Sequence, residues 1–161
     1  MASRKKFFMC LFVFVFFTAL GTSSADERSV ICLSSGQIVY VPVYSHIYIG
    51  NRERPFLLAV TLSIRNTDRN NPMVVKKATY YNSQGKLLEE YIKTPVTLKK
   101  MSATRFVVHE SDKAGGSGAS FLVEWESEKP VSPPIIETVM IGAKTQQGIS
   151  FTSRGQVIRE Q

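Results

Sequence analysis

A glycine-rich segment, Gly115-Gly116-Ser117-Gly118-Ala119, is the first place where residue types and spacing suggest chemistry. Ser117 would be the nucleophile of a serine hydrolase turn, but that turn lies between a strand and a helix. Here a strand is predicted to follow, and the Gly-Lys-Ser or Gly-Lys-Thr ending of a phosphate loop is absent. We therefore interpret the segment as a flexible inter-strand loop. The alternative is an anion-binding nest of backbone N–H groups around Gly116, helped by Lys113 or Arg154.

Residue types that bind metals are scarce and scattered. Beyond the N-terminal segment the sequence has His46, His109 and Cys32, with no short spacing between them. A zinc site needs several such side chains that converge, so we predict neither a metal nor a cofactor. His46 alternates with Tyr44 and Tyr48 along one predicted strand, where a hydrogen-bonded structural role is expected for the imidazole.

Three carboxylates, Glu124, Glu126 and Glu128, occupy alternate positions of a predicted strand and therefore share its solvent face. Paired catalytic carboxylates usually come from different elements around a cleft. We expect these three to meet Lys or Arg side chains of a neighbouring strand instead. The sequence thus predicts no catalytic residue.

Polar residues at predicted strand ends and in loops are the candidates for binding a ligand or partner, because loops on a rigid scaffold tend to carry binding groups. Turn capping and surface ion pairing are the competing roles for each of them. Chosen by position alone, the candidates are Arg65, Asp68, Asp112, Gly116, Ser117, Gln146, Gln147 and Arg154.

The elements that must position these residues are β-strands. Over residues 56–65 every even position is apolar, while Thr61, Ser63 and Arg65 take the other parity. Residues 120–126 alternate again, which predicts that Trp125 lies in the core. Residues 73–81 and 86–93 predict a hairpin whose turn uses Gly85. No segment shows the 3.6-residue period of a helix. We predict an all-β, immunoglobulin-like antiparallel sandwich of about eight strands, with a small closed barrel as the alternative.

The first predicted strand, residues 37–49, is rich in β-branched and aromatic residues but contains Pro42. Proline cannot donate a ladder hydrogen bond, so it is found at sheet edges and bulges. We therefore predict an edge strand that kinks at Pro42 and could carry the chain from one sheet to the other.

The N-terminus has the three parts of a secretory signal peptide. Arg4, Lys5 and Lys6 precede an uncharged apolar run over residues 7–20, and the small residues Ser23-Ser24-Ala25 follow it. A membrane anchor is the alternative, but the run is shorter than the roughly 20 residues that span a bilayer. We predict a signal peptide over residues 1–25, a flexible lead over 26–36 and one domain over 37–159.

Charge and cysteine content narrow the function classes. The net charge of +7 falls to +4 without the three basic residues of the signal peptide, and no run of five or six like charges appears. This dispersal, together with export, disfavours nucleic acid binding. Cys32 would be the only cysteine left, which excludes a disulfide within the exported chain.

Several blocks of the sequence carry a family resemblance, and they lie at residues 39–48, 62–68, 115–119, 123–125, 139–142, 146–151 and 153–155. Together they resemble the bacterial family called domain of unknown function 3124, over about residues 37–158. The family brings no assigned activity, ligand or site residue, and the resemblance implies an exported or envelope-associated protein.

Three functions fit these observations. The first is an exported, non-enzymatic binding module, periplasmic or secreted, whose partner is an unknown envelope protein or small ligand. It would bind through its loops, or through the apolar segment 39–49 as an edge strand that accepts a partner strand. The second is a hydrolase with an atypical site that uses Ser117 or His46. The third is a structural partner held at the membrane by an uncleaved N-terminus. We predict the first.

Overall fold

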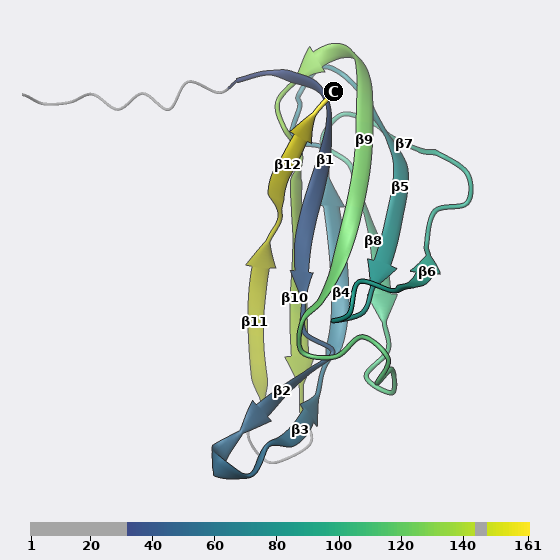
Figure 1. The fold of residues 1–161 in the computed structure, drawn as a ribbon. Coiled ribbons are helices and arrows are strands. Elements are labelled where there is room, and N and C mark those ends of the chain that lie inside the picture. The colour runs from purple at the N-terminus through teal and green to yellow at the C-terminus, as the bar shows by residue number, and fades with distance from the viewer. Residues whose placement is uncertain (1–31, 144–147) are drawn as a thin grey trace, which may run out of the picture. The chain divides into compact units, whose positions relative to one another are not determined.

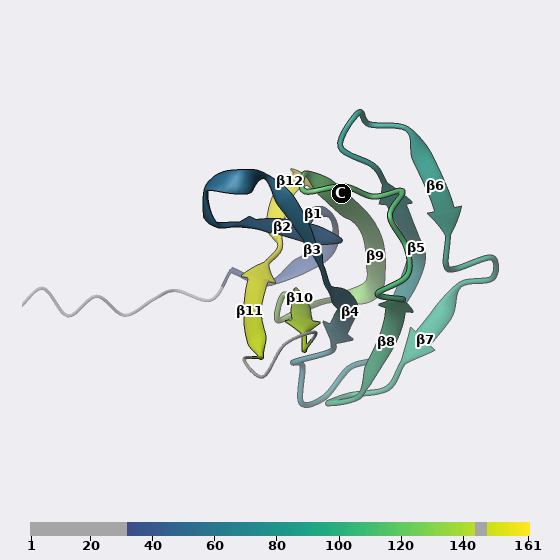
Figure 2. The ribbon, with the colours of Figure 1, turned by 90° about the horizontal axis from the view of Figure 1, so that it is seen from below.

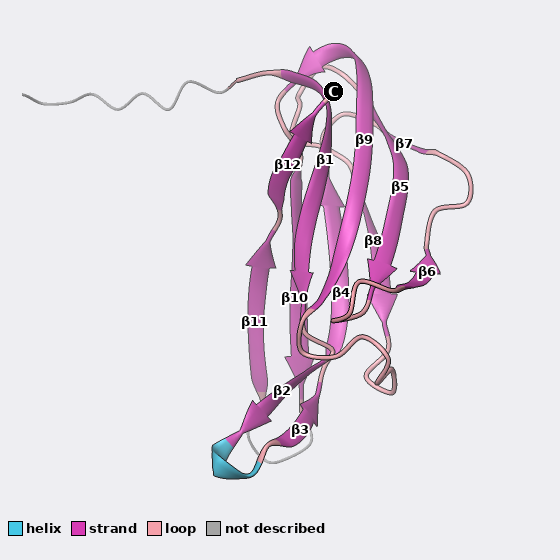
Figure 3. Cartoon of the chain, in the orientation of Figure 1, coloured by secondary structure: helices cyan, strands magenta, loops and turns pink. Residues whose placement is uncertain are grey.

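The computed structural model describes residues 32–143 and 148–161, within one compact unit that runs from Ile31 to Gln161. The predicted signal peptide lies outside the described residues and stays a prediction. The only helix in the described ranges is one 3-10 turn, η1 (Gly50–Arg52), drawn in cyan in Figure 3. No helix in these ranges has the length and apolar character needed to cross a bilayer.

Two antiparallel sheets form the layers of a sandwich (Figures 1 and 2). One sheet has the order β12-β1-β9-β5-β6, with β7 also paired to β5, and the other has the order β11-β10-β4-β8. Strands β2 and β3 form a separate hairpin. The strands are β1 (Ser34–Val43), β2 (His46–Ile49), β3 (Arg54–Leu57), β4 (Ala59–Arg65), β5 (Met73–Tyr81), β6 (Leu87–Glu90), β7 (Val96–Leu98), β8 (Ala103–Val108), β9 (Ala119–Val131), β10 (Ile135–Gly142), β11 (Ile149–Arg154) and β12 (Gln156–Glu160).

This arrangement confirms the predicted all-β antiparallel sandwich, although the described residues form twelve strands where about eight were expected. The β5–β6 hairpin is also confirmed, and Gly85 has the positive φ of 75° that its turn requires. The first strand begins at Ser34, before the predicted domain start. The Ser34 hydroxyl donates to Glu160 of β12 at 2.8 Å, so residues 34–36 belong to the sheet and not to a flexible lead.

The core lies between the inner faces of the two sheets, and the burial pattern of the strands follows the apolar alternation of the sequence. Trp125 is fully buried, as predicted. Burying one large apolar side chain of this kind stabilises the fold by roughly 1.5–3 kcal/mol, because apolar surface is removed from water. The main contributors are alternate residues of β1, of β9, and of β4 with the residue before it: Val39, Val41, Val43, Phe121, Val123, Trp125, Leu58, Val60, Leu62 and Ile64.

Strand β1 as a whole is not an edge strand, which corrects the prediction: it continues through Pro42 to Val43 and lies between β9 and β12 inside the six-stranded sheet. The pairing with β12 ends at Tyr40, however, so Pro42 lies where β1 is paired with β9 alone. The Pro42 carbonyl accepts a hydrogen bond from Thr138 Oγ1 at 2.7 Å. Since the N and O of one residue point to the same side of an antiparallel strand, the missing N–H faces away from β9. No hydrogen bond of the β1–β9 ladder is lost.

The chain passes from one sheet to the other at Gly155, between its last two strands, and not within its first strand. Strand β11 pairs with β10 in one sheet, and β12 pairs with β1 in the other. The Gly155 N–H donates to the Ile136 carbonyl at 2.8 Å. A Cβ at this position would lie 2.6 Å from Cγ1 of Val39, so the crossing requires glycine because the backbone passes so close to the core.

Candidate binding site at the hairpin end of the sandwich

The sequence-predicted site residues lie at opposite ends of the sandwich. Arg65 is the last residue of β4 and Asp68 lies in the loop after it, at the end where Ser34 pairs with Val131. Asp112, Gly116 and Ser117 lie at the other end, where Val43 pairs with Ala119. Strand β9 has 13 residues and spans about 40 Å between these ends. The two groups therefore cannot form one site. Gln146 and Gln147 lie outside the described residues.

Asp68 organises the loop that follows β4. Its Oδ1 accepts hydrogen bonds from the backbone N–H groups of Asn70 and Asn71, both at 2.8 Å, and its Oδ2 accepts one from Ser132 at 3.1 Å. These bonds, first of all those from Asn70 and Asn71, lower the pKa of Asp68 below its usual 3.8. The carboxylate thus ties two loops together, which is the capping role that competed with ligand binding.

The lowered pKa predicts how stability depends on pH. Because the folded pKa lies below the unfolded one, the contribution of Asp68 is complete above about pH 4 and is lost as the pH falls through the folded value. Asp68→Asn should lower the thermal midpoint at pH 7, and its difference from wild type should shrink below about pH 4. Calorimetric scans from pH 2 to pH 8 check this. A constant difference across the range would contradict it.

Arg65 and Arg154 come together on the outer face of the four-stranded sheet. Both flank Glu137 of β10, whose Oε1 lies 3.8 Å from Nε of Arg65, while Arg154 is the cross-strand neighbour of Glu137. Arg65 also donates to Ser63 Oγ at 3.0 Å. Two guanidinium groups around one carboxylate leave a net positive patch, which we call the arginine patch.

Two serines hold the glycine-rich loop in place through hydrogen bonds. The Gly116 N–H donates to Ser45 Oγ at 2.8 Å, and the Gly118 N–H donates to Ser83 Oγ at 2.9 Å. Ser45 is fully buried, and its own N–H and hydroxyl both donate to the Gly116 carbonyl. The N–H groups of Gly116 and Gly118 that a nest would use are thus engaged within the chain, and hydrogen bonds hold the loop in place.

Ser117 lacks the neighbours of a nucleophile in the described structure. Neither His46 nor His109 hydrogen-bonds to its hydroxyl, and the imidazole of His46 lies against Tyr48 instead, with Nε2 3.2 Å from the phenol oxygen. In the described ranges, no group of three or more His, Cys, Asp or Glu side chains could hold a metal ion. The thiol of Cys32 is free and exposed.

The β2–β3 hairpin forms a cleft with the loop that follows β8. The hairpin lies at the lower end of the molecule in Figure 1 and nearest the viewer in Figure 2. The cleft has a volume of about 410 Å³, within the usual range for small-molecule sites of about 300–1,000 Å³. A second hollow, lined by Glu110 and Ser111, shares Leu57 and Lys113 with it. The residues that line this hairpin cleft are His46, Tyr48, Glu53, Pro55, Leu57 and Lys113.

An aromatic pair makes one wall of the hairpin cleft. The Tyr48 side chain is exposed at 54%, and the His46 ring packs edge-on against it with centroids 5.2 Å apart. Because the Nε2 contact also fixes the phenol oxygen, the Tyr48 ring is held in place although solvent reaches it. A rigid, exposed aromatic ring offers a large contact area at low entropic cost.

Two charged residues line the hairpin cleft, one with a left-handed backbone conformation and one in a capped turn. Glu53 closes η1 with φ 40° and ψ 35°, a left-handed conformation that a residue with a Cβ adopts at a cost of roughly 1–2 kcal/mol. Lys113 lies in a turn that Asp112 caps, since Oδ1 of Asp112 accepts from the Ala114 N–H at 2.7 Å. Asp112 thus shapes the loop that carries Lys113.

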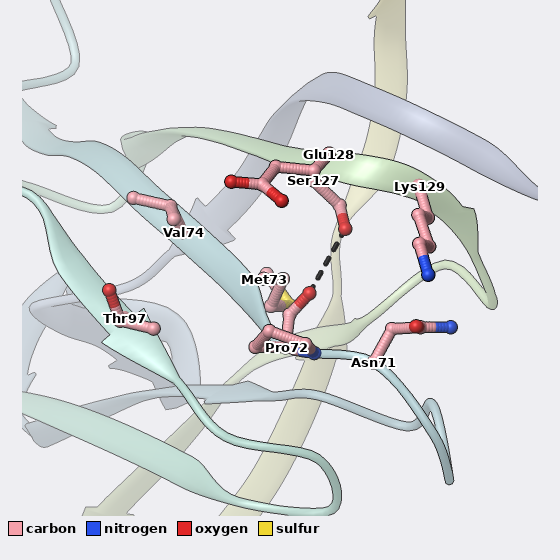
Figure 4. Close-up of a pocket in the computed structure, with 8 residues that line it drawn as sticks. All are labelled: Asn71, Pro72, Met73, Val74, Thr97, Ser127, Glu128 and Lys129. Atoms are coloured by element: carbon pink, nitrogen blue, oxygen red, sulfur yellow. Dashed lines mark hydrogen bonds between the residues drawn. The ribbon is translucent and has the colours of Figure 1, made fainter.

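A separate cavity of about 320 Å³ lies between β5, β7 and β9 (Figure 4). It opens where β9 diverges from β5, and Ser127 Oγ donates to the Pro72 carbonyl at 3.0 Å across it. Lys129 and Asn71 lie at one side of the view, and Val74 and Thr97 lie at the other. We call it the β5–β9 cavity.

The predicted pairing of the β9 carboxylates with a neighbouring strand is confirmed at Glu126, which binds Lys76 of β5 at 2.9 Å. Glu124 accepts a hydrogen bond from the Gln161 amide at 3.3 Å, and Lys77 is its cross-strand neighbour on β5. Glu128 lines the β5–β9 cavity. This face of β9 is thus used for structural pairing.

Residues 36–158 match the family model described as protein of unknown function, DUF3124. The chain belongs to this DUF3124 family. The match covers most of the chain and agrees with the resemblance seen in its sequence blocks. The family description assigns no function, so it places no activity in the hairpin cleft or elsewhere.

No curated protein matches the chain. Among solved structures, the chain is similar to the crystal structure of Thermotoga maritima 1070, with 14% sequence identity and a TM-score of 0.43. The similarity covers 78% of this chain and 97% of that chain. A TM-score at this level carries no conclusion about function.

Proposed function

We propose that this DUF3124 protein is an exported, non-enzymatic binding module that takes a small ligand in its hairpin cleft. The observation that carries the proposal is the gathering of a fixed exposed aromatic ring and charges of both signs from two segments, the β2–β3 hairpin and the loop after β8. Loops at one end of a sandwich are a common place for such sites, because the sheets hold them rigidly.

The chemistry of the lining favours a zwitterionic ligand with an apolar part, such as a free amino acid or a dipeptide. The Lys113 ammonium can bind a carboxylate, and the Glu53 carboxylate can bind an ammonium group. Tyr48, Pro55 and Leu57 supply an apolar wall for the ligand side chain. The cleft would therefore recognise the carboxylate, the ammonium group and the apolar side chain of the ligand.

Binding of a panel of free amino acids, dipeptides and monosaccharides, measured by calorimetry on the purified protein, tests this proposal. Tyr48→Ala and Lys113→Ala should each weaken binding of a zwitterion by about tenfold or more, the loss of one good contact. Thr97→Ala and Lys129→Ala in the β5–β9 cavity are the matched controls and should leave it unchanged. Binding that only the control variants abolish, or no binding at all, would overturn the proposal.

Export is the second part of the proposal, and the signal-like sequence of residues 1–25 supports it. When the full chain is expressed in a Gram-negative host, the purified protein should begin at Asp26, which mass spectrometry reads directly. A protein that keeps Met1 and stays with the membrane would favour the anchored alternative, and one that keeps Met1 in the cytosol would contradict export.

Variants of Glu53 separate the effect of its backbone strain on stability from the effect of its charge on binding. Glu53→Gly should raise the free energy of unfolding by about 1 kcal/mol, because glycine adopts a positive φ without the Cβ penalty. The same change should weaken zwitterion binding, because the carboxylate is lost. Glu53→Gln keeps the Cβ and removes only the charge, so it should weaken binding without the gain in stability. Urea unfolding and calorimetry measure both effects, and a Gly variant less stable than wild type would contradict the strain.

A further inference from the structure

Strand β11 is an open edge of the four-stranded sheet. It pairs with β10 from Ile149 to Arg154 without any shift of register, and no strand of the described structure pairs with its other side. Six residues in a regular strand present about 20 Å of evenly spaced backbone donors and acceptors. Such a row is a template for one more strand.

The other edges of the two large sheets in the described ranges carry features that disfavour strand addition, whereas β11 carries none of them. The phenol of Tyr91 donates to the Val107 carbonyl of β8 at 3.5 Å, so a side chain covers that edge. The β1–β12 pairing has an irregularity between Ile38 and Val39, which disturbs the outer edge of β12. Strands β6 and β7 have four and three residues. Strand β11 has no proline, lysine or register shift.

The direction of the β11 backbone groups follows from one hydrogen bond. The Gly155 N–H donates to Ile136 of β10, so alternate residues before it also face β10. The N–H and C=O groups of Ser150 and Thr152 therefore point outward, away from the sheet. A partner strand would bond to these two residues.

The side chains around this edge describe what the partner must look like. On the inner face, Ile149 and Phe151 are half-buried, and Phe151 packs against the Tyr44 ring at 5.7 Å. Where Gly155 takes the chain to the other sheet, a cleft of about 270 Å³ with a mixed polar and apolar lining opens. It is lined by Gln37, Val39, Pro133, Pro134, Ile135, Ile136, Arg154, Gly155 and Val157.

Charge decides between a second copy of the chain and another protein. The arginine patch lies at the last residue of β11, on its outer face, and has a net positive charge. Strand β11 itself contains no acidic residue. Two copies paired through β11 would therefore bring no further acidic side chain to either Arg154. An extended segment that carries an acidic residue would supply one.

We propose that β11 accepts an extended peptide segment of another protein as an additional strand. The segment has apolar residues at alternate positions for the inner face beside Ile149 and Phe151, and a carboxylate that meets Arg154. Main-chain hydrogen bonds would supply affinity, and the side-chain positions would supply specificity. This surface is independent of the hairpin cleft, so either proposal can fail while the other holds.

The test selects peptides from a phage-displayed library of random twelve-residue sequences on the purified protein. Selected peptides should be acidic with alternating apolar residues, and they should slow hydrogen exchange at Ser150 and Thr152. Thr152→Pro removes an outward donor without breaking the β10 ladder, so binding should weaken by about tenfold or more. Thr152→Val keeps the donor and should bind within about twofold of wild type.

Arg154→Glu gives a readout that does not depend on proline being tolerated. This variant should reverse the charge preference, binding lysine versions of the selected peptides better than acidic ones. Tyr48→Ala in the hairpin cleft should leave peptide binding unchanged. Peptides that protect other segments, equal binding by Thr152→Pro, or a protein dimer that already protects β11 would each overturn the proposal.

Discussion

Gly115→Ala is expected to destabilise the domain by about 3 kcal/mol, at the upper end of overpacking costs. A Cβ at this position would overlap the hydroxyl of Tyr80 and lie 2.8 Å from its Cζ. Tyr80 cannot move away easily, because it is fully buried and its ring packs on Phe121 at 5.1 Å. Burial, with a smaller effect of Asp112, also raises the pKa of Tyr80 to about 12, so the hydroxyl stays neutral. Urea unfolding at pH 7 measures the loss.

Two further variants separate the clash from a general effect of substituting glycine. Gly148→Ala meets no heavy atom closer than 4.0 Å and should change the stability by less than about 0.5 kcal/mol. Gly115→Ala combined with Tyr80→Phe should lose less stability than the sum of the single changes, because the overlapping oxygen is gone. A Gly115→Ala protein as stable as wild type would show that the loop does not pack on Tyr80.

Trp125→Ala should cost about 4 kcal/mol, because it removes the largest fully buried side chain and leaves a cavity between the sheets. Most small domains are stable by only about 5–15 kcal/mol, so the variant should be close to unfolding at room temperature. Since the change removes the only tryptophan, far-ultraviolet circular dichroism must follow the urea transition.

Trp125→Phe and an exposed control make this result specific. The indole Nε1 has no hydrogen-bond partner in the described structure, so phenylalanine loses volume but no hydrogen bond and should cost clearly less than alanine. Val107→Ala on the partly exposed face of β8 should stay within about 0.5 kcal/mol of wild type. Equal losses for alanine and phenylalanine at position 125 would contradict the packing account.

The parts of the fold that could be predicted are those encoded by local pattern. Alternation over residues 56–65 and around Trp125 gave the buried faces, because a strand turns every second side chain inward. Turn residues gave the β5–β6 hairpin. The sheet position of β1 could not be read in this way. Whether Pro42 lies at an edge depends on where β12 pairs, and β12 is over a hundred residues away.

The candidate site was harder to predict because its residues matter through non-local contacts. Ser45 looked like an ordinary strand residue, yet it holds the glycine-rich loop from 71 residues away. Tyr48, Glu53 and Pro55 were passed over because apolar and charged residues in a strand-like segment indicate packing or solvent exposure. The adjacent Gly50 and Asn51 were the available signal for a tight turn, and hence for a separate hairpin.

The location of the bound ligand tests the central claim most directly. We would record amide chemical shifts of the ¹⁵N-labelled protein during titration with the tightest zwitterion of the panel. The account predicts that the shifts concentrate on residues 46–57 and 110–113 and disappear in Tyr48→Ala. Shifts that concentrate around the β5–β9 cavity, or no shifts at millimolar ligand, would contradict it.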